Sequence, residues 1–94
     1  MVKIFHFRKE EKTKRSIFIQ TEATVPLEIM VAVGKRHIVG IGEIGNRSEI
    51  IEKPIIPFIK PPEPEEIAKE LLKKLGVPQN EWDEILKTKR EIVI

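Results

Sequence analysis

The stretch HIVGIGEIGNR, residues 37–47, places Gly40, Gly42 and Gly45 in a G-x-G-x-x-G spacing after a short apolar run. Loops that bind dinucleotide phosphates share this spacing, but they also need a helix that opens at the third glycine and a second parallel strand. Only NRSEIIEK separates Gly45 from Pro54, which leaves no room for that helix. Glycines two residues apart point to the same face of a strand, where bare backbone permits a bend, a bulge or close approach of another element. We therefore predict that these glycines serve the fold and that no nucleotide cofactor binds there.

Short runs rich in Ile, Val and Phe surround this stretch and predict an antiparallel sheet. The polar sequence KEEKTK has the length of a hairpin loop, and Gly34 with its two basic neighbours predicts a second turn. PLEIMVAVG could begin a helix at Pro26, but its β-branched residues and short length favour a strand. Four or five strands within residues 1–53 predict a β-meander or a small, partly open barrel. The runs are VKIFHFR, SIFIQT, LEIMVAV, HIVGIGEI and SEIIEK, the first two with apolar residues on both faces.

The remaining residues predict an extended segment followed by helices. Proline is so dense in PIIPFIKPPEP that residues 54–63 are expected to be extended and to lie on apolar surface. Apolar residues recur at helical spacing in PEEIAKELLKKLG, and Asn80 is placed to cap a second helix, so residues 64–89 predict a helical hairpin. Residues 90–94, REIVI, could add a last strand or pair with a second subunit. The fold class that follows is α+β, in a single domain of residues 1–94.

The composition excludes several classes of protein. The chain of 94 residues contains no cysteine, so disulfides, thiolate metal ligands and a cysteine nucleophile are excluded. No apolar run approaches the roughly 20 residues that cross a bilayer, and the N-terminus becomes charged within a few residues. We expect a soluble, cytoplasmic protein without a membrane partner. Its 34% charged residues, mostly Lys and Glu, together with abundant Ile, are typical of a heat-loving organism.

No set of residues predicts catalysis or metal binding. His6 and His37 are the two histidines, and neither has an Asp or Cys nearby in sequence to complete a set of metal ligands. Ser16 and Ser48 lack the motif that surrounds a nucleophilic serine. We therefore expect a protein that is not an enzyme, with no catalytic residue, no metal and no cofactor.

The charges are distributed unevenly along the chain. Residues 1–60 carry eleven Lys or Arg against seven Glu, whereas residues 61–94 carry six against eight acidic residues. If successive hairpin loops meet at one end of the sheet, their cations would form a basic rim suited to the phosphates of DNA or RNA. Phe5, Phe7 and Phe18 could stack on bases, but a chain with so few aromatic residues needs them in its core. The candidate nucleic-acid-binding residues are Arg8, Lys9, Lys12, Lys14, Arg15, Lys35, Arg36 and Arg47.

Two functions are compatible with these features. The favoured one is a small non-enzymatic nucleic-acid-binding protein that contacts phosphates through the basic hairpin loops. The alternative is a protein-protein interaction or scaffold subunit that docks through the Pro-rich apolar segment and the C-terminal tail. In either case the unpaired apolar stretches predict a homodimer or a subunit of a larger complex. The candidate partner-binding residues are Ile55, Ile56, Phe58, Ile59, Ile92, Val93 and Ile94.

Overall fold

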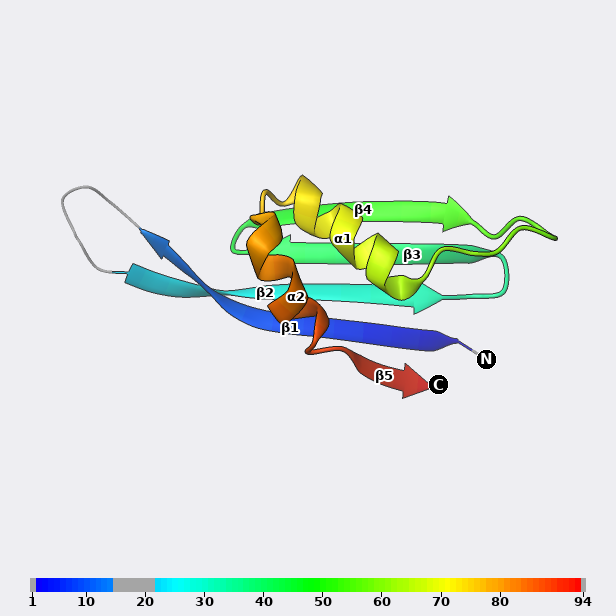
Figure 1. The fold of residues 1–94 in the computed structure, drawn as a ribbon, viewed down its shortest axis with the longest axis horizontal. Helices are drawn as coiled ribbons and strands as arrows, with labels where there is room; N and C mark the ends of the chain where they lie inside the picture. Colours follow the sequence, from blue (N-terminus) through cyan, green and yellow to red (C-terminus); the bar gives the residue numbers. More distant parts are fainter. Residues whose placement is uncertain (1, 15–21, 94) are drawn as a thin grey trace.

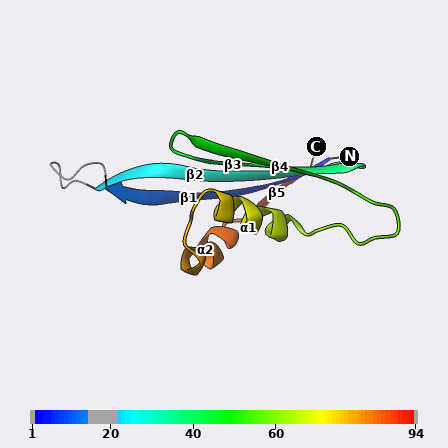
Figure 2. The same cartoon turned by 90° about the horizontal axis from the view of Figure 1, so that it is seen from above.

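The computed structural model describes residues 2–14 and 22–93 and shows an open, five-stranded antiparallel sheet with two short helices on one face (Figure 1). Figure 2 shows the sheet as one layer and the helices as a second layer beneath it. The α+β class and the meander are therefore confirmed, and the sheet does not close into a barrel. Its order is β4-β3-β2-β1-β5. The strands are β1 Lys3–Lys14, β2 Glu22–Val33, β3 His37–Ile44, β4 Arg47–Pro54 and β5 Arg90–Val93.

The first hairpin differs from the prediction. KEEKTK is not a loop, because β1 continues through it to Lys14, which pairs with Glu22 of β2. The apolar part of β1 pairs with LEIMVAV, with Phe5 opposite Val31, and SIFIQT lies outside the described residues. A two-stranded ribbon with no layer packed on it can be polar on both faces, so polarity alone does not end a strand. The strand assignment for LEIMVAV, in contrast, is confirmed.

The two longest strands extend past their neighbours as a ribbon that we call the arm. β3 pairs with β2 only from Leu27 onwards, and β5 pairs with β1 only as far as His6. Residues 10–14 and 22–26 therefore pair only with each other, and Figure 1 shows them projecting beyond the helices. Pro26 stands where the pairing with β3 ends, and proline in sheets is confined to such edge positions because it has no N–H to donate.

Both helices follow the prediction in place and differ in detail. α1 spans Pro64–Lys74, with Pro64 in its first turn, and Gly76 follows it at φ +80°. A short 3-10 turn over Gln79–Glu81 precedes α2, Trp82–Leu86. Asn80 is therefore not the N-cap of a longer helix, because it lies inside the 3-10 turn, where Glu81 N–H donates to the Pro78 carbonyl at 3.0 Å.

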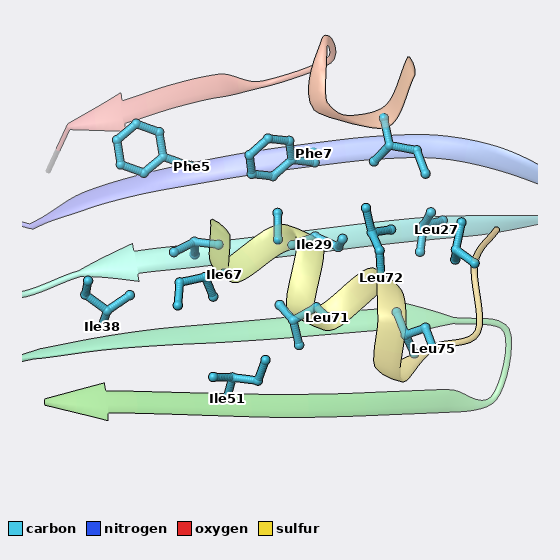
Figure 3. Packing of buried hydrophobic residues seen from close by; sticks show 14 residues of the cluster. Phe5, Phe7, Leu27, Ile29, Ile38, Ile51, Ile67, Leu71, Leu72 and Leu75 are labelled. Atoms are coloured by element: carbon cyan, nitrogen blue, oxygen red, sulfur yellow. The ribbon is translucent and has the colours of Figure 1, made fainter. Parts of the chain in front are cut away.

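The core lies between the sheet and α1, and the glycines of β3 allow α1 to approach the sheet closely. A Cβ on Gly40 would stand 2.6 Å from Ile67 Cγ2, and a Cβ on Gly42 would stand 3.0 Å from Leu75 Cδ1. The interpretation that these glycines permit close approach of another element is confirmed, and that element is α1 (Figure 3). Gly45, at φ +55°, forms the turn into β4. The buried apolar residues are Phe5, Phe7, Leu27, Ile29, Val31, Ile38, Ile51, Ile67, Ala68, Leu71, Leu72, Leu75, Val77 and Ile85.

Candidate interaction surfaces

The structure divides the basic residues between opposite ends of the sheet. Consecutive turns of a meander alternate between the two ends, so the β2–β3 turn with Lys35 and Arg36 lies at the end away from the arm (Figure 1). The single basic rim expected from the sequence is therefore not formed, because only every second hairpin returns to the same end. Lys12 and Lys14 lie on the arm, and Arg15 lies outside the described residues.

Arg47 has a structural role in this arrangement. Its guanidinium donates to the carbonyl oxygens of Leu75 at 3.2 Å and Lys74 at 3.1 Å, which belong to the C-terminal turn of α1. A cation that satisfies these last carbonyls also interacts favourably with the negative end of the helix. Arg47 thus joins the β3–β4 turn to α1.

Two further cations of the set are paired with carboxylates on opposite faces of the sheet. Arg8 faces away from the helices, with Nε 3.8 Å from Glu28 Oε1 and Nη2 3.4 Å from Glu10 Oε1. Lys9 faces the helices, and its Nζ donates to Glu84 Oε2 of α2 at 2.9 Å. The hydrogen bond from Lys9 holds the pKa of Glu84 below its usual value. Phe5 and Phe7 are buried under the helices, which confirms their place in the core, and Phe18 lies outside the described residues.

The segment between β4 and α1, residues 55–63, presents apolar side chains to solvent, and we call it the Phe58 loop. Its first residue is anchored, since Ile55 packs against the core and its N–H donates to the Arg36 carbonyl at 2.7 Å. A turn follows, closed by a hydrogen bond from Ile59 N–H to the Ile56 carbonyl at 3.2 Å. Within that turn Phe58 has φ +69° and is fully exposed.

This turn combines a favourable residue with an unfavourable one. Proline at the second position and positive φ at the third describe a type II turn, and Pro57 suits the second position. The third position normally holds Gly or Asn, because a side chain is strained there, whereas here it holds Phe58. Ile56 and Ile59, on either side, are 52% and 60% exposed. The turn therefore displays three large apolar side chains on a strained backbone.

Cations lie beside the base of the Phe58 loop. The hydrogen bond between Ile55 and Arg36 fixes the loop beside the β2–β3 turn, where Lys35 and Arg36 are exposed. Lys60, on the loop itself, is also exposed, with Glu63 3.9 Å away. Two cations therefore lie beside the base of the loop, and a third, Lys60, lies within the loop near a carboxylate.

The C-terminal tail pairs within its own chain. β5 lies antiparallel to β1, with Ile92 opposite Ile4 and Arg90 opposite His6 (Figure 1). Ile92 and Val93 nevertheless stay about half exposed, because no described element covers this edge of the sheet. Ile94 lies outside the described residues.

The histidines stand apart on the sheet. His6 Nε2 is 3.7 Å from Glu28 Oε1, and His37 Nε2 is 3.9 Å from Glu52 Oε1. Residues 2–14 and 22–93 contain no group of three or more His, Cys, Asp or Glu placed to hold a metal ion. Nor do they contain a helix long and apolar enough to cross a membrane.

Sequence reasoning missed the conformation that makes Phe58 distinctive. The tetrapeptide Ile-Pro-Phe-Ile contains half of a type II turn signal, the proline, but phenylalanine at the following position argues against that turn. Extended chain was the natural expectation, and only the backbone shows the positive φ.

No family model matches the chain, and no solved structure matches it. A relative is "Uncharacterized protein 72" of Sulfolobus islandicus filamentous virus (isolate Iceland/Hveragerdi), which is 58% identical over 91 residues. The match covers 97% of this chain and 92% of the relative. Identity at this level over nearly the full length of both proteins shows common descent, and the chain therefore belongs to the family of this viral protein.

Proposed function

We propose that the protein is a small, non-enzymatic docking subunit that binds another protein through the Phe58 loop. The observation that supports this function best is a fully exposed phenylalanine held at φ +69°. An exposed apolar side chain favours the protein-interaction alternative. The nucleic-acid alternative has less support, because the cations that were expected to bind phosphates are divided between the two ends of the sheet. A cytoplasmic location, expected from the composition, belongs to the same proposal.

The free energies explain why such a turn suits binding. A bulky residue in the left-handed region costs about 1–3 kcal/mol, and strain of this kind gathers where a protein binds or reacts. Complete burial of a phenylalanine in a partner returns about 1.5–3 kcal/mol from the removal of apolar surface from water. Pro57 and the prolines after Lys60 restrict the loop before binding, so little conformational entropy is lost on docking. The turn therefore holds Phe58 in an exposed conformation before a partner binds.

The surroundings of the loop define the partner. Phe58, Ile56 and Ile59 need a concave apolar pocket, as aromatic anchors of protein interfaces do. Lys35 and Arg36 lie beside the base of the loop and would face carboxylates on the rim of that pocket. We therefore expect a protein partner with an aliphatic or aromatic pocket flanked by Asp or Glu.

Photo-crosslinking tests this proposal directly. Phe58 is replaced by a photoreactive phenylalanine analogue in cells that produce the protein, and Lys69, an exposed residue of α1, is replaced in the same way as the matched control. We expect the analogue at position 58 to capture one main partner that the analogue at position 69 does not. Identical products from the two positions would contradict the proposal.

Binding with purified components completes the test. We expect Phe58→Ala to weaken binding of the captured partner by at least about 30-fold, which corresponds to roughly 2 kcal/mol for an anchor residue. Lys69→Ala should leave the affinity unchanged. Equal affinity for wild type and Phe58→Ala would remove the loop from the interface.

A second candidate function rests on the arm. Two-stranded ribbons can enter the grooves of nucleic acids, and residues 10–14 and 22–26 form such a ribbon. Five cations lie at or near it in sequence, namely Arg8, Lys9, Lys12, Lys14 and Arg15, against four glutamates, Glu10, Glu11, Glu22 and Glu28. The excess of positive charge is small, so this function has less support than docking.

Salt dependence separates the two candidates. If the arm binds nucleic acid, replacing Lys12, Lys14 and Arg15 with Ala should weaken binding and flatten its salt dependence by about one unit of slope per lost phosphate contact. Lys35→Ala, at the opposite end of the sheet, is the matched control and should change neither quantity. No binding of DNA or RNA at low salt would leave docking as the single function proposed.

A further inference from the structure

We propose that two copies of this chain join edge to edge, by antiparallel pairing of β4 with the β4 of a second copy. The pairing uses residues 48–54 and none of the Phe58 loop, so it does not depend on the proposed docking function. It would continue the five strands of one copy into the five strands of the other as a single sheet.

β4 is an open edge of the sheet. It is the last strand in the order β4-β3-β2-β1-β5, and all eight of its residues pair with β3. No described strand pairs with its other side, which forms the upper edge of the sheet in Figure 1. The opposite edge is shorter, because β5 has four residues. An open edge presents a row of unpaired N–H and C=O groups, which a further strand can satisfy.

The hairpin with β3 determines which backbone groups of β4 are free. The turn between the two strands has two residues, so the N–H of Arg47 points back to the carbonyl of Ile44. Just beyond the other end of β4, Ile55 N–H donates to the Arg36 carbonyl at 2.7 Å. Because N–H groups alternate between the two sides of a strand, the odd-numbered residues of β4 bond to β3. The free groups therefore belong to the even-numbered residues Ser48, Ile50, Glu52 and Pro54.

Few registers are open to two copies of β4. A two-fold axis perpendicular to the sheet gives an antiparallel pair and keeps the helices of both copies on one face. Free groups must meet free groups, so the axis passes through one residue, and the centres that pair most of the strand are residues 49, 50, 51 and 52. A centre at Glu49 or Glu52 places that carboxylate opposite itself, and a centre at Ile50 places Arg47 opposite Lys53 of the second copy. Like charges directly opposite each other destabilise a sheet, which disfavours all three.

The register centred on Ile51 matches in charge. Glu49 and Lys53 stand two residues before and after Ile51, so each Glu49 would lie opposite Lys53 of the other copy. Lys53 donates to Glu70 of α1 at 2.7 Å, and Glu49 has no ion pair among the described residues. Arg47 is bonded to the carbonyl oxygens at the end of α1 and lies outside the paired residues. Charge on an edge strand usually deters pairing, and here it selects a second copy in one register.

The remaining residues of β4 fit this register. Ile51, which is buried beside the core, would meet its own copy on the face that carries the helices. On the other face, exposed Ile50 would lie opposite Glu52 of the second copy, and each would donate to the other's carbonyl. Ser48 N–H would donate to the carbonyl of Pro54, which has no N–H of its own and therefore ends the row.

The joined sheet would hold the two Phe58 loops at opposite ends, because this axis reverses the direction of the strands. If the loops dock as proposed above, one dimer would bind two partner molecules. The contact between two strands of residues 48–54 is smaller than a standard protein interface. We therefore expect the dimer to dissociate in the micromolar range.

Sedimentation of the wild-type chain at about 1 and about 100 µM tests association, and Glu49→Lys tests the edge. The variant sets lysine opposite Lys53 on both sides of the axis, and we expect it to raise the dissociation constant about tenfold. Glu43→Lys makes the same change at an exposed residue of β3, away from the edge, and should leave dimerisation unchanged. A monomeric wild type at about 100 µM, or unchanged dimerisation of Glu49→Lys, would overturn the proposal.

Mixing two variants tests the register. Lys53→Glu should weaken its own dimer as Glu49→Lys does, but a mixture of the two has opposite charges at both positions. With circular dichroism confirming that each variant is folded, we expect tagged Glu49→Lys to bind Lys53→Glu about tenfold more tightly than it binds its own copy. Equal binding to both would show that residues 49 and 53 do not meet, which would overturn the proposal.

Single cysteines test the same register without relying on charge, because the chain has no cysteine of its own. Residue 49 and residue 53 of the second copy would have Cα atoms about 4.5 Å apart, within reach of a disulfide. Two copies of residue 49 would be roughly 14 Å apart, since four residues of a strand rise about 3.4 Å each. We expect oxidation to link Glu49→Cys to Lys53→Cys in a mixture and neither variant to itself. Linkage of Glu49→Cys to its own copy, or no linkage in the mixture, would overturn the proposal.

Discussion

Gly40 provides the most quantitative test of how the sheet and α1 fit together. A Cβ at this position would stand 2.6 Å from Ile67 Cγ2 and 2.9 Å from Leu71 Cδ1. Leu71 can rotate its terminal methyl away, but the branched side chain of Ile67 is fully buried and has little rotational freedom in a helix. Gly40→Ala therefore requires Ile67, and with it the first turns of α1, to move by about 0.8 Å before an ordinary contact of 3.4 Å is restored.

The cost follows from two opposing contributions. Overpacking of a core typically costs about 1–3 kcal/mol. Replacing a strand glycine with alanine gives back about 0.5–1 kcal/mol, because the unfolded chain has less conformational entropy. We expect Gly40→Ala to lower the free energy of unfolding by about 1–2 kcal/mol. At about 4–8 °C per kcal/mol for a domain of this size, Tm should fall by roughly 5–15 °C.

Chemical and thermal denaturation measure this change, and two further variants assign it. Gly42→Ala should cost less, since its nearest neighbour is the flexible tip of Leu75 at 3.0 Å. In an Ile67→Ala background, which lacks the clashing methyl group, Gly40→Ala should be neutral or stabilising. A Gly40→Ala variant as stable as wild type, or equally destabilised in both backgrounds, would show that close approach of α1 is not what requires glycine.

Three further results are expected. The hydrogen bond from Lys89 lowers the folded-state pKa of Glu65, so the stability that Glu65 contributes should be fully present above its ordinary pKa of 4.5 and lost as the pH falls through the lowered value. The free energies of unfolding of wild type and Glu65→Gln, measured by urea titration, should therefore converge in acid. A difference that does not depend on pH would contradict this. Phe58→Gly should be more stable than Phe58→Ala by roughly 0.5–1 kcal/mol in thermal melts, since alanine also resists a φ of +69°; equal stability would argue against strain. Calorimetry should detect no ATP or NAD binding, and saturable binding that Gly42→Val abolishes in a folded chain would refute the architectural role of the glycines.

Sequence reasoning succeeded where a local pattern and the tertiary structure agree. Ile67, Leu71 and Leu75 recur at helical spacing and form the inner face of α1, and alternation in β3 placed Gly40 and Gly42 on one face. Each of these predictions needed only the period of a helix or a strand. The close approach of α1 remained one of three alternatives, since no sequence pattern reports which element packs on a bare strand.

The failures have a common physical origin in the arrangement of hairpins. After Lys9, the polar sequence KEEKTK pairs with residues 22–26 in the arm, which projects beyond the helices, so hydrophobicity carried no signal there. That error hid the arm and placed the basic residues at loops that were assumed to share one end of the sheet. The capping role of Arg47 depends on a contact with Leu75, which is far away in sequence, and could not be read from local spacing.

Apolar residues on the face of the sheet that carries no helix were visible in the sequence, but the sequence did not show which surface they would form. Continuous runs such as IMVAV indicate strands with two apolar faces, and the expectation of self-association followed from apolar surplus. It was assigned to the C-terminal tail and the Pro-rich segment because both looked unpaired. β5 instead pairs with β1, and the apolar surface next to it appears only once the register is known.

The docking function is tested most directly by the affinity of the partner captured at position 58 for three purified chains at two salt concentrations. The chains are wild type, Phe58→Ala and the arm variant with Lys12, Lys14 and Arg15 replaced by Ala. We expect Phe58→Ala to bind at least about 30-fold more weakly at both salt concentrations, while the arm variant binds as wild type does. Loss of affinity in the arm variant, with Phe58→Ala unaffected, would contradict docking through the Phe58 loop.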